Sequence, residues 1–577
     1  MRRMLALAGL AFGLPWVAWG QAPTSQSAAL PAGVERVLKY VPDDTHLLII
    51  VPSMDGLATG VAAFGKAIVL PELAEVNARE MLTEMLGANA AALDTHGALV
   101  LALSAAHDEP LLLATLARDE GWKGTTQPTR LDDETLVYEF GPERFLAAST
   151  NGVAILAREK SELRRALEAR GKGGERCAAA LAPCLAQRQV ALYVDIPAWK
   201  SVIDAQMTLV SQGMYMGMAA AGPDAELGMQ VWNWMLEQVK NIVAESRTFV
   251  ATVRIDAQGV CADGRATFDA DGQVVRYLQG VQRPRRDLLR GLPTTTAPVL
   301  MAFEWEEAPG AVGPQEAMSR AILRMDAVKE KIDGEKLATV MKQTIEMNRR
   351  VPGSSAVFSF SPEERGLLYW GLYLTREGPA VQREMRSIWE LTPELVNAWG
   401  TFPGALARGE PERIGGVDAD VYKFDFDTDA ALRQPMLQAL YGRDPTLYMA
   451  PHPEGLAYAF GPQTEARARL ADILDTERPP LRTAARVTSL FKHFSADPQC
   501  CLVVDLPAVF RSVSGMLAQF GLPVPAVELK DEQPPLAGAT LYLEPESIRT
   551  ELFAPAEPIK DLIKAIGSLD GGKSEAY

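Results

Sequence analysis

Residues 190–202 read VALYVDIPAWKSV, and residues 500–513 read CCLVVDLPAVFRSV. Each segment runs from an apolar, β-branched stretch into an Asp, and a Pro follows that Asp after one apolar residue. Asp195 therefore corresponds to Asp505, which lies 310 positions later. A single match of this kind is weak, but it directs attention to internal repetition along the chain.

Five further pairs of segments match in the same order. Residues 41–51 match 292–303, 98–116 match 356–374, 128–140 match 411–424, 145–167 match 447–470, and 249–268 match 539–553. Chance rarely produces six collinear matches, so the sequence predicts a unit copied in tandem. The expected organisation is a flexible N-terminal segment (21–34), a first repeat (35–284), a second repeat (285–567) and a C-terminal tail (568–577). The boundary is expected near the charged stretch RPRRDLLRG at 283–291.

Each repeat carries more strand patterns than helix patterns. Apolar side chains recur at residues 249, 251, 253 and 255, with Thr252 and Arg254 between them, which is the period of a half-buried strand. Gly152, Gly259 and Gly455 separate paired strand-like runs and predict hairpins. Apolar residues at spacings of three and four over 318–332 predict a helix. The expected fold class is α+β, in which an antiparallel sheet with helices packed on one face is made twice.

The composition is that of a folded, acidic protein. The chain has 577 residues, of which 48% are hydrophobic and 23% are charged. Lys and Arg number 57 against 73 Asp and Glu, a formal net charge of −16. Such a balance argues against nucleic acid as a partner, and against an anionic membrane bound through bulk electrostatics.

Residues 1–20 predict a secretory signal peptide. Arg2 and Arg3 precede an apolar stretch too short to span a bilayer, and Ala18 and Gly20 place small side chains before a cut at Gln21. The mature protein is therefore expected to be exported, periplasmic or extracellular, without a transmembrane anchor. Its cysteines leave the pairing open. They are Cys177, Cys184, Cys261, Cys500 and Cys501, an odd number, so at least one free thiol or intermolecular bond is expected.

Asp195 and Asp505 are the candidate catalytic residues. Two carboxylates at equivalent positions of a duplicated chain could share general acid–base work across a pseudo-twofold axis. The simpler interpretation is structural, because each Asp ends a strand two residues before a Pro that suits a helix's first turn. A carboxylate there caps the helix and interacts with its dipole. The sequence favours this capping role.

Met214, Met216 and Met218 are the candidate metal ligands. Thioethers suit Cu(I), but no His supplements this cluster, and glycines and alanines surround it. A flexible apolar helix that fills an irregular groove accounts for the same residues and is favoured. No cofactor is expected.

The phrases VPDDTHLLIIV at 41–51 and ALYVDIPAWKSV at 191–202 resemble those of a family of exported bacterial proteins. That family is known only as a domain of unknown function, so the resemblance implies export and no established activity. The leading hypothesis is an exported, non-enzymatic protein that binds a partner protein or small ligand of the cell envelope. The alternatives are an extracytoplasmic hydrolase with a site assembled from distant residues, and a copper-binding protein.

Overall fold

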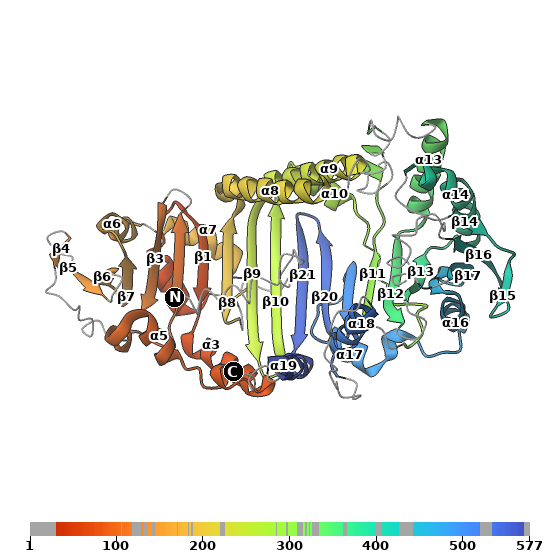
Figure 1. The fold of residues 1–577 in the computed structure, drawn as a ribbon. Helices are drawn as coiled ribbons and strands as arrows, with labels where there is room; N and C mark the ends of the chain where they lie inside the picture. The colour runs from red at the N-terminus through yellow and green to blue at the C-terminus, as the bar shows by residue number, and fades with distance from the viewer. Residues whose placement is uncertain are drawn as a thin grey trace. The chain divides into compact units, whose positions relative to one another are not determined.

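The computed structural model describes much of the chain after residue 29 and divides it into two compact units. The described residues are 30–570 except 105–106, 118–128, 132–135, 141–144, 170, 183, 186–187, 220–224, 284–285, 296–297, 309–315, 318–319, 322–323, 326–333, 362–365, 400–404, 426–441, 443 and 520–533. Unit 1 holds the described residues up to Ile203, together with Val243–Val275 and Glu544–Lys560. Unit 2 holds Asp204–Ile242, Arg276–Leu543 and the described residues from Asp561 onward. Figure 1 labels the elements of both units.

Unit 1 is built on an antiparallel sheet. Its strands, in spatial order, are β5 (Leu136–Phe140), β6 (Phe145–Thr150), β7 (Val153–Ala157), β3 (His107–Thr115), β2 (Leu99–Ser104), β1 (Thr45–Val51), β8 (Val190–Asp195), β9 (Ser246–Asp256), β10 (Gly259–Phe268) and β21 (Ser547–Pro555). The short β4 (Thr129–Arg130) pairs with β5. Adjacent strands are antiparallel throughout, as the sequence predicts.

Unit 2 is likewise built on antiparallel strands. Its strands, in spatial order, are β20 (Ala537–Glu544), β19 (Cys500–Val504), β11 (Val299–Glu304), β12 (Gly353–Ser361), β13 (Gly366–Leu374), β18 (Gly455–Pro462), β17 (Pro445–His452) and β16 (Val417–Asp425). Beyond these, β14 (Ala405–Arg408) and β15 (Glu412–Ile414) both pair with β16.

The two strand orders agree under the six sequence matches. The matched pairs are β5 with β16, β6 with β17, β7 with β18, β3 with β13, β2 with β12, β1 with β11, β8 with β19, and β9 with β20. Each pair holds the same place in its sheet. Descent of the two units from one duplicated ancestor stays a prediction.

The three predicted glycine turns are confirmed as hairpins. Asn151 and Gly152 connect β6 to β7 with φ angles of 47° and 75°, the signature of an Asn-Gly hairpin turn. Gly259 begins β10 at φ 151°, and Gly455 begins β18 at φ 152°. Glycine suits all three positions, because side chains with a Cβ rarely adopt positive φ.

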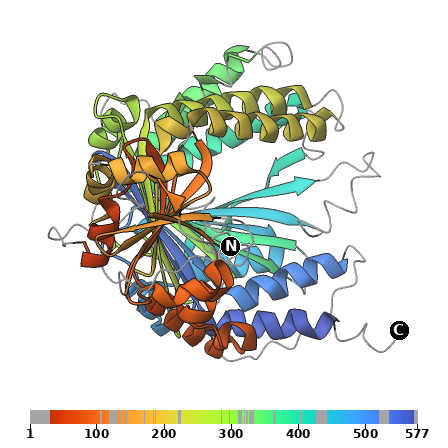
Figure 2. The same ribbon diagram turned by 90° about the vertical axis from the view of Figure 1, so that its left-hand side faces the viewer.

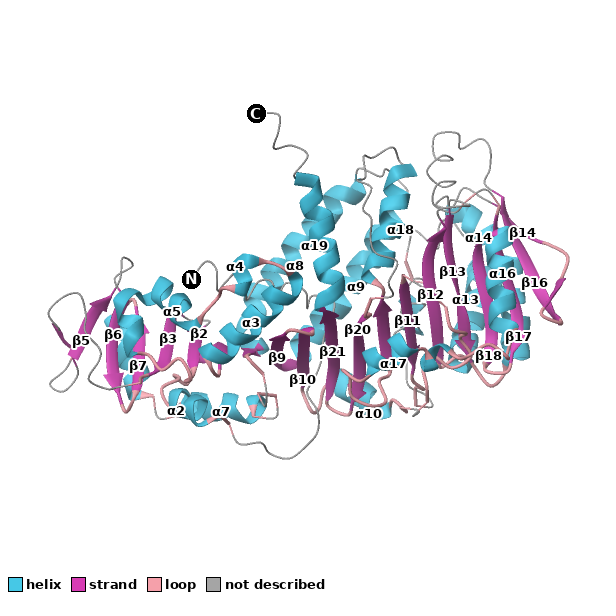
Figure 3. Cartoon of the chain, turned by 90° about the horizontal axis from the view of Figure 1, so that it is seen from below, coloured by secondary structure: helices cyan, strands magenta, loops and turns pink. Residues whose placement is uncertain are grey.

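Helices pack on both faces of the unit 1 sheet, and the expectation that they cover one face is wrong. One core joins the sheet to α2 (Ala32–Leu38), α6 (Lys160–Glu168) and α7 (Lys172–Leu181), and the other joins it to α3 (Met54–Ile68) and α5 (Ala78–Leu86). Figure 3 shows α2 and α7 on one side of these strands and α3 and α5 on the other.

The strand β7 shows why both faces are covered. Val153 and Ile155 enter one core, whereas Ala154 and Leu156 enter the other, and the strand is buried throughout. A strand that is apolar on both sides needs cover on both sides. Unit 2 follows the same rule, since α14 (Gly378–Trp399) packs with the apolar cluster on one face of β18 and α16 (Gln463–Leu474) contacts the same strand.

The remaining helices connect or flank these layers. They are α4 (Pro71–Ala74), η2 (Gly87–Ala92), α8 (Ile196–Ala219), α9 (Ala225–Glu245), α10 (Gln273–Gly280), α13 (Gly334–Arg350), η4 (Leu481–Thr483), α17 (Ala485–Phe491), α18 (Leu506–Gln519) and α19 (Ala556–Asp570). No helix in the described ranges combines the length and the apolar character needed to cross a bilayer. The helix expected over 318–332 lies mostly outside the described residues.

The observed boundaries differ from the expected ones at three places. The signal peptide at 1–20 lies outside the described residues, but α2 begins at Ala32 inside the segment expected to be flexible, and Val34 is fully buried. At the other end, α19 continues to Asp570, past the expected start of the tail. Unit 1 also takes β21 from the second expected repeat, because β21 pairs with β10.

Candidate functional site

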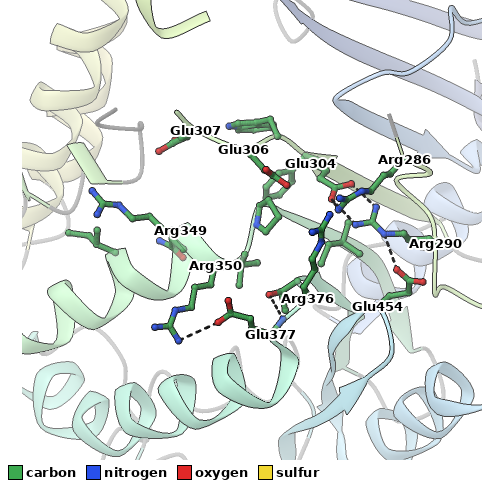
Figure 4. Close-up of a pocket in the computed structure, with 18 of the residues that line it drawn as sticks. Arg286, Arg290, Glu304, Glu306, Glu307, Arg349, Arg350, Arg376, Glu377 and Glu454 are labelled. Atoms are coloured by element: carbon green, nitrogen blue, oxygen red, sulfur yellow. Dashed lines mark hydrogen bonds and ion pairs between the residues drawn. The ribbon is translucent and has the colours of Figure 1, made fainter. Parts of the chain in front are cut away.

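A pocket of about 970 Å³ opens at one end of the unit 2 sheet. Figure 4 shows most of the residues that line it. Its floor is formed by the end of β11, the residues just before β12, the end of β13 and the turn before β18. Antiparallel pairing brings these strand ends side by side. The C-terminal end of α13 and the residues before α14 form its sides. The pocket therefore lies wholly within one unit.

The lining is strongly charged and nearly balanced. Five arginines and six glutamates contribute to it: Arg286, Arg290, Arg349, Arg350, Arg376, Glu304, Glu306, Glu307, Glu316, Glu377 and Glu454. Which of these charges already have partners decides what the pocket can bind.

Glu304 is the most deeply buried of these charges. Its side chain is 0% exposed, and Arg290 donates to both carboxylate oxygens, at 2.6 and 2.7 Å. Arg286 donates to the same carboxylate at 3.4 Å, and Arg290 also reaches Glu454 at 3.1 Å. Burial lowers the pKa of Arg290, but its bonds to the two glutamates outweigh this and leave the pKa above its ordinary value. This network is therefore satisfied internally.

The arginines at the end of α13 are also paired. Arg349 donates to Glu316 at 2.6 Å. Arg350 lies 2.7 Å from Glu384 and 3.7 Å from Glu377, which Figure 4 shows beside it. The pair of Arg350 with Glu384 holds the C-terminal turn of α13 against α14.

Arg376 and Glu306 differ from the other charges of the pocket. Within the described residues, neither side chain forms a hydrogen bond or an ion pair. Both backbones are held nevertheless: Glu306 exchanges backbone hydrogen bonds with Gln282 at 2.7 and 3.0 Å, and the neighbour of Arg376, Thr375, donates its backbone N–H to Glu454. Figure 4 places both side chains in the middle of the pocket. The pocket thus presents one cationic and one anionic group that its own residues leave unpaired.

Trp305 adds an aromatic surface beside these charges. Its ring is half-buried and lies with its centroid 5.1 Å from that of Phe303, which also lines the pocket. Trp305 donates its backbone N–H to Pro352 across 3.0 Å, which ties the end of β11 to the residue before β12. An indole face next to a guanidinium and a carboxylate suits a small polar ligand with some apolar body.

The candidate catalytic residues take part in local structure. Asp505 precedes α18, and its Oδ1 accepts the Ala508 N–H at 3.0 Å, which is an N-cap bond. Its Oδ2 accepts from Arg486 at 2.8 Å. Asp195 ends β8 and lies 3.8 Å from Arg176 of α7. Asp195 belongs to unit 1 and Asp505 to unit 2, and each is engaged within its own unit.

The candidate metal ligands lie on α8 and are largely exposed. Met214 is 38% exposed and Met216 is 73% exposed, and the side chain of Met218 is not among those described. Residues two apart on a helix point in different directions, so Met214 and Met216 do not face one site. Their exposure also contradicts the interpretation that they fill a groove. No group of three His, Cys, Asp or Glu side chains arranged for a metal occurs in the described residues.

All five cysteines are free thiols. Cys177, Cys184 and Cys501 are buried, and burial raises the pKa of Cys177 and of Cys184 to about 11. A buried thiol with a raised pKa stays protonated and is a poor nucleophile or metal ligand. The three buried cysteines therefore behave as small apolar core residues, whereas Cys261 and Cys500 are partly exposed.

Part of the pocket could have been predicted from two charged stretches of the sequence. The stretch at 283–291, interpreted as a boundary, supplies Arg286 and Arg290, and the carboxylate they bind belongs to the Glu-Trp-Glu-Glu run at 304–307. A basic cluster followed shortly by an acidic one predicts ion pairing. Arg376 and Glu454 reach the pocket only because strand pairing brings the end of β13 next to the start of β18. Their spacing in the sequence gives no sign of this.

Comparisons with known proteins place the chain in no family. No family model matches it, and no curated protein matches it. Among solved structures, crystal form I of the protein TP0453 aligns with a TM-score of 0.22 and 9% identity over 40% of this chain and 78% of the other. Crystal form III of the same protein aligns with a TM-score of 0.19 and 10% identity, over 48% of this chain and 98% of the other. The resemblance to a family of exported proteins stays a prediction.

Proposed function

We propose that this chain is an exported, non-enzymatic binding protein whose ligand site is the pocket of unit 2. The single observation that carries the proposal is the unpaired state of Arg376 and Glu306 in a pocket whose other charges are largely matched. Export rests on the signal-peptide pattern at 1–20, and the scaffold is two α+β units of the same strand order, which we take to descend from a tandem duplication.

The ligand is a small zwitterion of the amino acid or short peptide type. Arg376 offers a planar pair of donors that matches a carboxylate, and Glu306 offers an acceptor for an ammonium group. Trp305 lies next to Glu306 in the chain and supplies an apolar face for the body of such a ligand. Ligands with one charge leave the other group unpaired and bind less tightly.

Binding is favoured over catalysis by the side chains that the pocket contains. The described lining residues include no His, Cys, Lys or Ser, and Thr375 provides the only hydroxyl among them. The Thr375 hydroxyl already accepts the Glu377 N–H at 3.1 Å. Arginine and ion-paired glutamate hold a ligand in place, but they do not form a nucleophile with an adjacent base.

Isothermal titration of the mature protein with Ala-Ala tests the proposal, with N-acetyl-Ala-Ala and Ala-Ala-amide as singly charged probes. We expect Ala-Ala to bind and each blocked probe to bind about tenfold more weakly. Arg376→Gln should remove the preference for the free carboxylate, and Glu306→Gln the preference for the free amine. Arg383→Gln, an exposed arginine on α14 outside the pocket, is the matched control. Equal affinity for all three probes, or no effect of either pocket variant, contradicts the proposal.

A further inference from the structure

The exposed apolar surface of this protein is concentrated on two helices. Twelve large apolar side chains are exposed among the described residues, and nine of them lie on α8 and α9. The nine are Val202, Leu209, Val210, Met214, Tyr215, Met216, Met235, Val239 and Ile242. Scattered exposed apolar residues are ordinary, whereas a contiguous group of this size marks a surface that another phase or molecule covers.

The two helices lie side by side. Figures 1 and 2 show α8 and α9 next to each other in perpendicular views, and the Tyr215 hydroxyl is hydrogen-bonded to Asn233. We call α8 and α9 together the helical pair. The exposed apolar side chains of these two neighbouring helices therefore contribute to one surface.

The exposed apolar residues of α8 do not follow one stripe. Successive residues of an α-helix are rotated by about 100°, so Leu209, Val210, Met214, Tyr215 and Met216 point around most of the circumference. The less exposed side of the same helix carries Asp204, Met207 and Ser211, and Ser211 is only 8% exposed. Ile203 also lies on this less exposed side, so apolar side chains occur on both the inward and the outward side of α8, whereas a surface helix in water confines them to its inward side.

This distribution distinguishes between two kinds of covering. A helix that docks into the groove of a partner protein presents anchors along one face, at spacings of three, four and seven. A helix with apolar side chains over most of its circumference suits a surrounding medium rather than a groove. The lipid interface is such a medium, and it accommodates helices that lie in its plane without crossing it.

The charges of the helical pair define the lipid. Residues 205–223 contain no Asp, Glu, Lys or Arg, although 23% of the whole chain is charged. The described acidic residues nearest this run in the sequence are Asp204 and Glu226, and the exposed lysines Lys200 and Lys240 lie near the N-terminal end of α8 and the C-terminal end of α9. Because both lysines lie outside this uncharged run, the run itself has no electrostatic attraction for anionic headgroups, and net-neutral headgroups match it best.

We infer that the helical pair lies in the interfacial layer of a lipid bilayer with zwitterionic headgroups. Leu209, Val210, Met214 and Met216 enter the boundary between headgroups and acyl chains, and α9 follows through Met235. Trp232 and Trp234 of α9, both half-buried, lie at the depth where indole rings are favoured. The protein is in this way held at a membrane surface.

Vesicle flotation of the full mature chain tests this inference. With phosphatidylcholine vesicles, we expect the protein to float with the lipid, and the double variant Leu209→Asp, Met216→Asp to lose about tenfold in partitioning because it buries two charges or leaves the interface. Val513→Asp, at an exposed apolar residue of α18, is the matched control and should float like the wild type. Including phosphatidylglycerol should weaken binding rather than strengthen it.

A second measurement keeps the result independent of folding defects. Brominated phosphatidylcholine should quench the tryptophan emission of the wild type, and Trp232→Phe with Trp234→Phe should remove most of that quenching while the protein still floats. Failure to float, or equal flotation of the Leu209→Asp, Met216→Asp variant, overturns the inference. So does a dimer in sedimentation equilibrium that this double variant dissociates, because the helical pair then covers a second copy.

Discussion

Arg486 donates a hydrogen bond to Asp505 across 2.8 Å, and it precedes Asp505 by 19 residues, as Arg176 precedes Asp195 in unit 1. In unit 1 the corresponding Arg176 lies 3.8 Å from Asp195. The two pairs join the helix before a strand to the end of that strand. They differ in burial, because the Asp505 side chain is 7% exposed and the Asp195 side chain is 20% exposed. The Arg–Asp pair is therefore expected to contribute more to the free energy of unfolding in unit 2 than in unit 1.

We expect Arg486→Ala to lower the free energy of unfolding of unit 2 by about 3 kcal/mol, because it leaves a buried carboxylate without its cation. Asp505→Asn keeps the cap to Ala508 and should cost less than Asp505→Ala, which removes the cap and the ion pair together. Urea denaturation followed by circular dichroism measures these differences. Arg176→Ala is the internal control and should cost under about 1 kcal/mol; equal losses for the two arginines would contradict the burial argument.

Stability should depend on pH through Asp263. Burial raises the pKa of this carboxyl to about 6 from its usual 3.8, against the opposing effect of Arg188 at 2.5 Å. Between those pH values the folded state keeps a proton that the unfolded state has released, so the free energy of unfolding falls as the pH rises.

Relative to Asp263→Asn, the wild type should lose about 2 kcal/mol between pH 4 and pH 6, because each pH unit well between the two pKa values corresponds to about 1.4 kcal/mol and the change is smaller near each pKa. Denaturation curves of both proteins at several pH values give this difference directly. Asp271→Asn, at an exposed carboxyl of the same unit, should show no such trend. A wild type that gains stability over this interval would show that Arg188, rather than burial, controls the carboxyl.

The thiols should be unreactive until the protein unfolds. Because burial raises the pKa of Cys500 to about 11, as it does for Cys177 and Cys184, little thiolate is present near pH 8. Titration with a chromogenic disulfide reagent should proceed slowly in the native state and reach five thiols in guanidinium chloride. A final count of three would reveal a disulfide that the structure does not contain.

Gly455→Ala should be far more damaging than Gly416→Ala. Both glycines have positive φ, but a Cβ on Gly455 would meet the Tyr373 carbonyl oxygen at 2.0 Å, whereas a Cβ on Gly416 meets nothing within 4 Å. The Gly416 variant should lose about 1 kcal/mol from conformation alone. The Gly455 variant adds a clash with the backbone of β13, and thermal unfolding should rank the two accordingly. Similar melting temperatures would mean that the hairpin relaxes around the new methyl group.

Local patterns predicted the strands and their turns but not what covers them. Alternation in β9 and the Asn-Gly pair at 151–152 are read within a few residues, so the sheet and its hairpins follow from the sequence. The cover of both sheet faces depends on β7, whose unbroken apolar run fits a helix or a strand equally by composition. The pocket depends on contacts such as Arg290 with Glu454, 164 residues apart, which no local period encodes.

The pairing of β21 with β10 also constrains how the molecule can be made. Unit 1 takes β21 from residues 547–555, so this unit is incomplete until the chain has been synthesised past Pro555. A premature chain that stops before Ser547 leaves the edge of β10 open, and such an edge readily pairs with other chains. Truncation before Ser547 should therefore damage unit 1 first, although most of that unit lies several hundred residues earlier in the sequence.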